Sequence, residues 1–194
     1  MTLGRVSRPA RGSGRWAVGS LGGMRRALAA LSLVVLAVAL GGCAGLGGGN
    51  NVSVIPPDER TPAPAFRVDS LVGSGEVALA DYAGTPVILN FWASWCEPCQ
   101  REMPALVEFS KERRGVQVVG LAVTDQPSAS RAFARKVGAD FPLGIDRRGD
   151  TIATFGATGL PATVFIDREG RVAGTAFGEL TRQQFEGYAE KLES

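Results

Sequence analysis

Two runs of nearly continuous apolar residues most constrain how this chain folds: PVILNFW at 86–92 and QVVGLAV at 117–123. Such runs are typical of central strands that are covered on both faces, as in a parallel sheet. The segment between them, from Cys96 to Arg114, has apolar residues at helical spacing. Pro104 lies inside this predicted helix and is expected to kink it. A strand, a helix and a second strand in this order predict an α/β fold.

The other elements of residues 66–194 extend this core. Strands are expected at Phe66–Asp69, Glu76–Leu79, Pro142–Asp146, Ala162–Asp167 and Arg171–Phe177. Helices are expected at Ser128–Val137, Asp150–Phe155 and Thr181–Leu192, the last with Thr181 as its cap. The turn chemistry at 167–170 joins the last two strands as a hairpin. The order predicts a central mixed β-sheet flanked by helices, with an N-terminal β-hairpin extension.

The N-terminal region has the features of an export signal. Residues 27–40 are a run of fourteen residues that are all apolar except Ser32. A membrane-spanning helix needs about 20 such residues, whereas the core of a signal peptide needs about 7–15. Arginines precede the run, and Leu40-Gly41-Gly42-Cys43 follows it. This ending resembles the bacterial lipoprotein box, in which the cysteine is diacylated and becomes the new N-terminus. The alternative is a short membrane-seeking helix with an unrelated cysteine.

These features divide the chain into three parts. Residues 1–43 are predicted to be a lipoprotein signal peptide, with Met24 as an alternative start. Residues 44–65 are punctuated by glycine and proline and are predicted to be a flexible tether. Residues 66–194 are predicted to form one folded domain. The localisation that follows is the extracytoplasmic face of the cell membrane, through a lipid anchor.

The charge distribution excludes several classes of function. Six arginines and no acid lie in residues 1–43, which leaves fifteen basic and nineteen acidic residues in the rest. A nucleic-acid-binding domain needs a basic patch, so this chain is not expected to bind nucleic acid. The sequence has no histidine, which excludes His-based catalysis and disfavours a catalytic zinc site. No cofactor and no metal are expected.

The chemistry-bearing motif is Cys96-Glu97-Pro98-Cys99, at the end of a predicted strand and the start of a predicted helix. Half of a zinc site and a merely structural disulfide are the alternatives, but the chain offers no second ligand pair, and so short a loop gives little stabilisation. Free N–H groups at a helix start stabilise a thiolate. Cys96 is therefore the predicted nucleophile, and Cys99 resolves the mixed disulfide. Pro98 suits the first helical turn.

Two segments together carry a family resemblance. FWASWCEPCQREMPAL at 91–106 and GLPATVFID at 159–167 resemble the thioredoxin superfamily, with most similarity to its extracytoplasmic TlpA/ResA-like (DsbE-like) thiol–disulfide oxidoreductases. The resemblance covers essentially residues 63–194. It implies a thioredoxin-like fold in which Pro161 is cis and lies against the two cysteines. It also implies that the backbone at Leu160 pairs with an extended substrate.

The same resemblance gives roles to polar residues near the motif. Asn90 stands where cytosolic thioredoxin has a buried acid. Glu102 matches a glutamate that ResA-like proteins hold beside the active site, where it would move protons for Cys99. The alternative for Glu102 is an idle, solvated position on the helix surface.

The aromatic and charged neighbours of the cysteines are expected to form the substrate face. Trp95, Glu97 and Pro98 are candidate substrate-binding residues, whereas Trp92 is predicted to be plain core. Because Glu97 places a negative charge beside Cys96, the thiol pKa should be less depressed than in a strong oxidant. This favours a reductase.

The predicted function is a membrane-anchored reductase of disulfides in exported proteins, with apocytochrome c as one possible substrate. Its expected partners are exported proteins with thiols or disulfides and a membrane electron-donor or acceptor protein, and a monomer is expected. The alternatives are an oxidase that forms disulfides in secreted proteins, a peroxiredoxin-like antioxidant, and a non-enzymatic binding lipoprotein. A peroxiredoxin would need a threonine where Ala93 stands.

Overall fold

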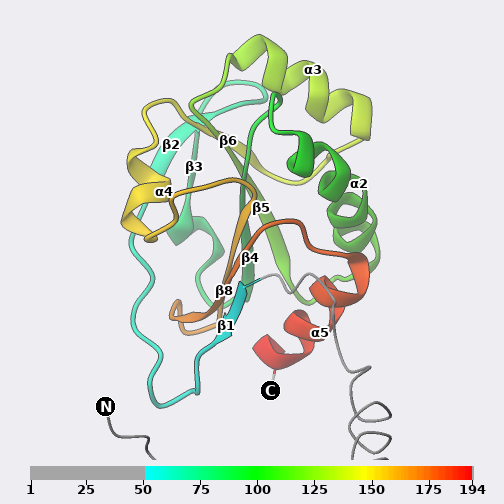
Figure 1. Ribbon diagram of the computed structural model, residues 1–194. Coiled ribbons are helices and arrows are strands. Elements are labelled where there is room, and N and C mark those ends of the chain that lie inside the picture. The colour runs from blue at the N-terminus through cyan, green and yellow to red at the C-terminus, as the bar shows by residue number, and fades with distance from the viewer. Residues whose placement is uncertain (1–50, 194) are drawn as a thin grey trace, which may run out of the picture. The chain divides into compact units, whose positions relative to one another are not determined.

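The computed structural model describes residues 51–193 and is built around one mixed β-sheet (Figure 1). Its strands are β1 (Asn51–Val54), β2 (Arg67–Ser70), β3 (Glu76–Ala78), β4 (Val87–Trp92), β5 (Gln117–Val123), β6 (Leu143–Asp146), β7 (Ala162–Ile166) and β8 (Val172–Phe177). Within the described residues their order across the sheet is β1-β8-β7-β4-β5-β6-β2-β3.

The centre of the sheet is parallel and fully buried. β4 pairs in parallel with β5, and β5 pairs in parallel with β6. Every residue of β4 is buried, and six of the seven residues of β5 are buried. On the other side of β4, β7 pairs antiparallel with β4, and β8 pairs antiparallel with β7. This confirms the predicted mixed sheet with two covered central strands.

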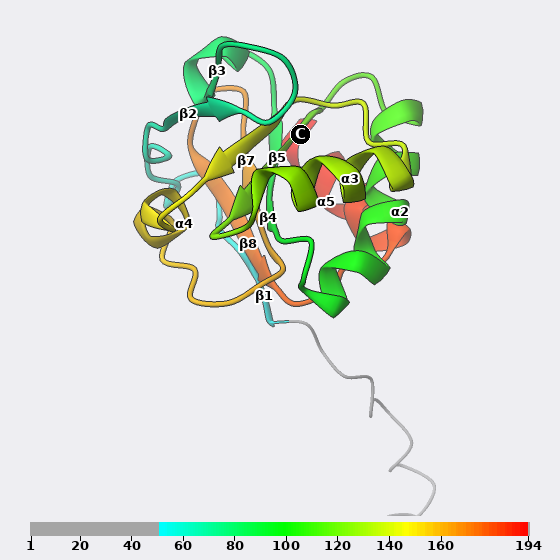
Figure 2. The same cartoon turned by 90° about the horizontal axis from the view of Figure 1, so that it is seen from above.

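Helices cover both faces of the sheet (Figures 1 and 2). One face packs against α2 (Glu97–Glu112), α3 (Pro127–Val137) and α5 (Arg182–Glu193), and the other packs against η1 (Leu79–Tyr82) and α4 (Asp150–Thr154). α2 continues through Pro104. Four of its apolar residues are buried, and they follow the helical spacing of this segment: Met103, Leu106, Val107 and Phe109. Thr181 caps α5 together with Gln184, as expected.

The N-terminal hairpin extension is present. β2 and β3 pair antiparallel, and β2 joins the sheet by pairing antiparallel with β6. The hairpin therefore lengthens the sheet on the side away from β7 and β8. This placement leaves the region around the start of α2 uncovered by the extension (Figure 2).

The prediction that residues 44–65 form a flexible tether is wrong for residues 51–65. β1 pairs antiparallel with β8, with Asn51 opposite Phe177 and Val54 opposite Gly174. The Ile55 N–H then donates to the Ala173 carbonyl at 2.9 Å. A Cβ at Gly174 would come within 2.7 Å of the Ser53 carbonyl oxygen, so only glycine admits so close a strand.

The segment after β1 is also held to the domain. Arg60 forms an ion pair of 3.3 Å with Asp167, whose side chain is 2 % exposed. Pro62 forms an isolated bridge with Arg171. Glycine and proline thus marked irregular backbone here, but long-range partners fix it in place.

The predicted signal peptide, Met24, Cys43 and residues 44–50 lie outside the described residues. Among residues 51–193, no helix combines the length and the apolar character that a membrane span requires.

Candidate active site

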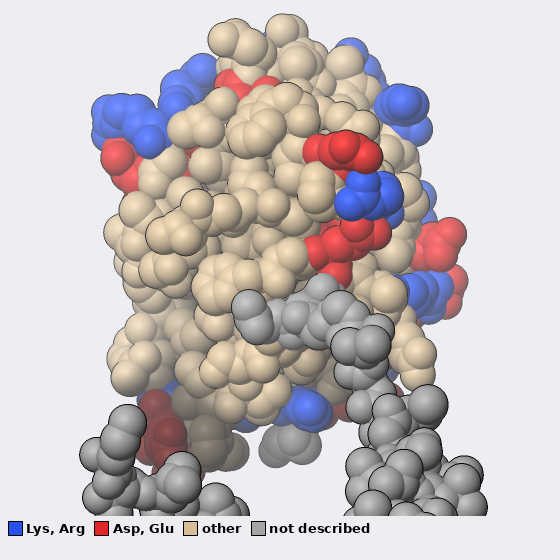
Figure 3. Space-filling view, viewed as in Figure 1, with Lys and Arg blue, Asp and Glu red and all other residues tan. Residues whose placement is uncertain are grey.

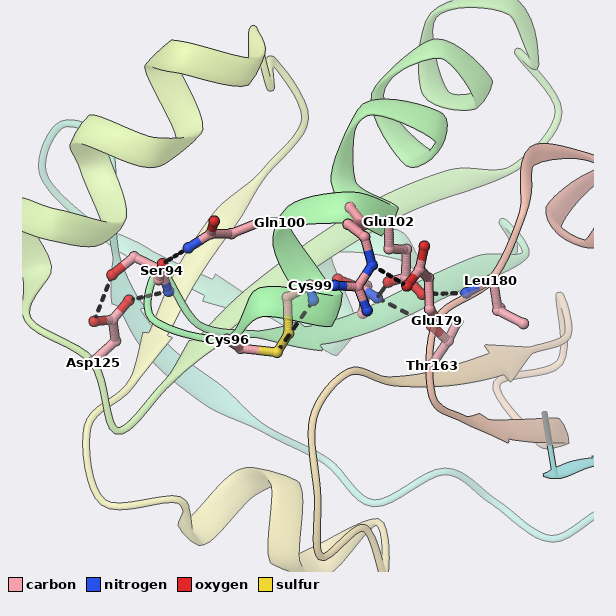
Figure 4. Close-up of a disulfide and its surroundings, with 11 residues drawn as sticks. Ser94, Cys96, Cys99, Gln100, Glu102, Asp125, Thr163, Glu179 and Leu180 are labelled. Atoms are coloured by element: carbon pink, nitrogen blue, oxygen red, sulfur yellow. Dashed lines mark hydrogen bonds and ion pairs between the residues drawn. A yellow bond between two sulfur atoms is a disulfide. The ribbon is translucent and has the colours of Figure 1, made fainter. Parts of the chain in front are cut away.

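The two cysteines form a disulfide where β4 gives way to α2 (Figure 4). Their Cα atoms are 5.2 Å apart. Cys96 is the N-cap of α2, and its sulfur accepts a hydrogen bond from the Cys99 N–H at 3.2 Å. A sulfur at this position receives the unpaired donors of the first helical turn, which stabilise a thiolate. Both cysteines are buried, and Cys96 is slightly more exposed than Cys99, at 4 % against 1 %.

Pro161 lies at the same end of the sheet as the disulfide. The Leu160–Pro161 peptide bond is cis, as the resemblance implied. The next residue, Ala162, pairs with Phe91 near the end of β4, so the two strands bring Pro161 beside the start of α2. The Pro161 carbonyl accepts a hydrogen bond from the Gly178 N–H at 2.9 Å. Leu160 is half-buried.

Glu102 is buried one helical turn after Cys99, with 2 % of its surface exposed. The alternative of a solvated position on the helix surface is therefore wrong. One carboxylate oxygen accepts a hydrogen bond of 2.7 Å from the Asn90 side-chain amide, and the other accepts one of 2.7 Å from the Leu180 N–H. Burial raises the pKa of Glu102 to about 7, against the lowering effect of these two hydrogen bonds. A carboxyl with this pKa can take up and release a proton at neutral pH.

Asn90 connects Glu102 to the strand that follows Pro161. Its Nδ2 also donates to the Thr163 hydroxyl at 3.0 Å, while its Oδ1 is buried without a hydrogen-bond partner. Half a turn of the amide exchanges the nitrogen and the oxygen. The oxygen could then accept a hydrogen bond from a protonated Glu102, so the amide suits both protonation states.

Asp125 lies on the other side of the disulfide from Glu102 (Figure 4). Its carboxylate accepts hydrogen bonds from the Ser94 N–H at 2.7 Å, the Ser94 hydroxyl at 2.9 Å, the Ser130 hydroxyl at 2.7 Å and the Gln126 N–H at 2.8 Å. Burial would raise the pKa of Asp125, but these donors together hold it below its ordinary value. Asp125 therefore stays ionised and fixes the loop that leads into Trp95 and Cys96.

Asp125 was not predicted from the sequence. The available signal was its position just after β5, because β4 and β5 are parallel and their carboxyl ends share one edge of the sheet. A polar residue there lies near the active-site loop. Thr163, Leu180 and Arg101 were missed as well, since their contacts depend on tertiary packing.

The surface around the disulfide combines exposed aromatic rings with a small charged cluster. Trp95 is 61 % exposed, so its ring is accessible, and its role in substrate binding stays a prediction. Trp92 is fully buried core, as predicted. Phe177 is also exposed and pairs with Ala162. In the view of Figure 3, charges of alternating sign lie over α2, and much of the rest of the visible face is uncharged.

The site contains thiol chemistry and carboxylates but no metal-binding set. Within residues 51–193, no group of three or more histidine, cysteine, aspartate or glutamate side chains is arranged to hold a metal ion. What the arrangement supports is exchange of a disulfide between Cys96, Cys99 and another protein, with Glu102 as a buried proton acceptor.

Comparison with known proteins agrees with this chemistry. Residues 60–175 match the AhpC/TSA family. The chain is 37% identical over 132 residues to the thiol–disulfide oxidoreductase ResA of Bacillus thuringiensis (strain Al Hakam), which covers 67% of this chain and 76% of that protein.

Two crystal structures from Corynebacterium are similar in fold. A DsbF homologue from Corynebacterium diphtheriae superposes with a TM-score of 0.69 at 29% identity, over 76% of this chain and 97% of that one. A secreted thiol-disulfide isomerase from Corynebacterium glutamicum also gives a TM-score of 0.69, at 27% identity, over 76% and 95% of the two chains.

The chain therefore belongs to the AhpC/TSA family of thioredoxin-fold proteins. Within that class it is a thiol–disulfide oxidoreductase of the ResA and DsbE type. The peroxiredoxin-like alternative is disfavoured, because position 93, where a peroxiredoxin would need a threonine hydroxyl, is a fully buried alanine.

Proposed function

We propose that this oxidoreductase works as a reductase of disulfides in exported proteins. Thiol–disulfide exchange rests on the buried Glu102, whose pKa is about 7 and which lies one helical turn after the resolving Cys99. The observation that carries the reducing direction is the negative charge of Glu97 beside Cys96. In this direction the Cys96 thiolate attacks a substrate disulfide, which forms a mixed disulfide and releases one substrate thiol. Glu102 takes the proton of Cys99, whose sulfur then attacks Cys96. The products are the reduced substrate and the Cys96–Cys99 disulfide.

The charge beside Cys96 supports the reducing direction. Glu97 and Glu179 are both paired with Arg101, so this cluster of two carboxylates and one guanidinium carries one net negative charge. A strong oxidant surrounds its reactive sulfur with positive charge instead, which stabilises the reduced form. No histidine is present to reverse the sign.

A reduction potential separates this proposal from the oxidase alternative. The full chain should reduce the interchain disulfides of insulin, which a non-enzymatic binding protein would not do. Equilibration with glutathione should give a potential nearer to thioredoxin at about −270 mV than to DsbA at about −120 mV. A potential near −120 mV would contradict the reductase proposal and favour the oxidase alternative.

We further propose that the chain is anchored to a membrane through acylated Cys43, on the extracytoplasmic side. The support is the Leu40-Gly41-Gly42-Cys43 sequence after an apolar run, together with one structural relative that is described as secreted. Two acyl chains are what stable anchoring requires. Cys43→Ala should abolish labelling by a radioactive fatty acid and release the protein from membranes, whereas equal labelling of both proteins would contradict the anchor.

We propose a membrane protein with a reactive dithiol as the electron donor, because a lipid anchor keeps the oxidoreductase at the membrane surface. Apocytochrome c is a candidate substrate. The test is whether the protein reduces the disulfide of purified peptides that contain paired cysteines.

A further inference from the structure

Three consecutive residues, Gly178, Glu179 and Leu180, contact three different parts of the active site. The Gly178 N–H donates to the Pro161 carbonyl at 2.9 Å, and the Leu180 N–H donates to the Glu102 carboxylate at 2.7 Å. Gly178 has a φ of 93°, a backbone conformation that residues other than glycine rarely adopt. This 178–180 segment is therefore fixed at both ends to groups beside the disulfide.

The middle residue of the segment is joined to the cysteine motif through Arg101. The Arg101 Nε donates to the Glu179 carboxylate at 2.9 Å, and its Nη1 donates to the Glu97 carboxylate at 3.0 Å. A guanidinium can bind two carboxylates at once because its donors point in fixed, divergent directions. Arg101 thus links the residue that follows Cys96 to the segment that contacts Pro161 and Glu102.

The link contributes little to folding stability. The side chains of Arg101 and Glu97 are 51 % and 84 % exposed, and ion pairs of this kind contribute little in measured cases. Its location suggests a different effect. Without the positive charge of Arg101, Glu97 and Glu179 would place two uncompensated negative charges close to Cys96. A thiolate at Cys96 would then be less stable, which disfavours the reduced form of the pair.

We propose that Arg101 is a positioning residue of the dithiol site, which sets the exchange equilibrium of Cys96 and Cys99 by holding Glu97 and Glu179 together. The inference rests on the proposed thiol–disulfide exchange. In the defining reaction, two glutathione thiols reduce the Cys96–Cys99 disulfide, and the products are the dithiol and one glutathione disulfide. Arg101 takes no electron or proton in this reaction and acts only through charge and position.

The test compares the full chain with three variants. Arg101→Gln removes the charge but retains hydrogen-bond donors, and Arg101→Lys retains the charge without the fork. Arg182→Gln is the matched control, because Arg182, like Arg101, pairs with two carboxylates, here Glu112 on α2 and Glu186 on α5. Mass spectrometry of the alkylated peptide with Cys96 and Cys99 gives the equilibrium constant with glutathione, free of interference from Cys43.

In about 0.01 M salt, Arg101→Gln should shift the equilibrium about threefold toward the disulfide, the size expected for an exposed charge pair. In about 1 M salt most of that shift should disappear, because charges are then screened within about 3 Å. Arg101→Lys should stay closer to the wild type than Arg101→Gln, and Arg182→Gln should match the wild type. Equal constants for Arg101→Gln and Arg182→Gln, or a shift that high salt leaves unchanged, would overturn the proposal.

The outcome is independent of the reductase proposal. The equilibrium constant of the wild type decides between reductant and oxidant, whereas the difference between variants decides the role of Arg101. A wild type that fails to reduce insulin would contradict the function and leave the comparison of variants readable.

Discussion

Two carboxylates flank the disulfide and differ in almost every respect. Glu102 is buried and accepts two hydrogen bonds, and its pKa is raised to about 7. Asp125 is partly buried and accepts four, and its pKa is held below the ordinary value. Glu102 loses more hydration than Asp125 and accepts fewer hydrogen bonds, so the two pKa shifts have opposite signs. The comparison assigns proton transfer to Glu102 and a fixed structural charge to Asp125.

The largest expected effect comes from the sulfurs that both carboxylates serve. Cys96→Ser should abolish insulin reduction, because the attacking thiolate is lost. Cys99→Ser should still attack and should accumulate mixed disulfides that non-reducing gels detect, since Cys99 is needed for resolution. If alkylation of the reduced protein at neutral pH modified Cys99 before Cys96, the two roles would have to be exchanged.

The next effect concerns how Glu102 makes the unfolding free energy depend on pH. Its folded-state pKa of about 7 lies above the ordinary value of 4.5. The folded protein therefore binds this proton more tightly, so the stabilisation is complete below about pH 4.5 and is lost as the pH rises through about 7. From pH 5 to pH 8 the unfolding free energy of the wild type should fall by about 3 kcal/mol more than that of Glu102→Gln. Urea unfolding at the two pH values measures this, and parallel pH profiles would contradict a buried, raised carboxyl.

Asp125 should behave in the opposite way. Because its pKa is lowered on folding, its stabilisation is present above its ordinary value of 3.8 and is lost as the pH falls through the folded-state pKa. Asp125→Ala leaves the donors of Ser94, Gln126 and Ser130 without their acceptor and should cost about 2 kcal/mol of unfolding free energy. This deficit should stay constant from pH 5 to pH 8 in urea unfolding. A deficit that changed across this range would mean that Asp125 titrates near neutrality.

The smallest effect comes from a single donor to Asp125. Ser130→Ala removes one of the four hydrogen bonds and should cost about 1 kcal/mol of unfolding free energy. Exchange with insulin should change little, because the Ser94 contacts that fix the active-site loop remain. A large loss of exchange activity in this variant would show that Asp125 supports catalysis more directly than its contacts suggest.

Much of the fold could be predicted because its central strands are buried on both faces and the apolar residues of its helices recur at helical spacing. The position of Cys96 at a helix start was predictable for the same reason. β1 was not, because the four residues NVSV lie among glycines and prolines. Their pairing depends on Gly174, which leaves room for the strand more than a hundred residues later.

The site was predicted to the extent that it lies in local motifs. Glu102 was recognised by resemblance, but one of the two hydrogen bonds to its buried carboxylate comes from the Leu180 N–H, 78 residues away. The contact of Asp125 with Ser94 spans 31 residues. Neither partner can be read from helical or strand periodicity, since both depend on how the sheet brings loops together.

The pH dependence of mixed-disulfide resolution tests the comparison most directly. The Cys96 mixed disulfide with a small thiol is prepared, and its resolution by Cys99 is followed from pH 5 to pH 9. The account predicts a rate that rises through an inflection near pH 7 in the wild type and in Asp125→Ala, and no such inflection in Glu102→Gln. An inflection near pH 7 that survives in Glu102→Gln, or that disappears in Asp125→Ala, would contradict it.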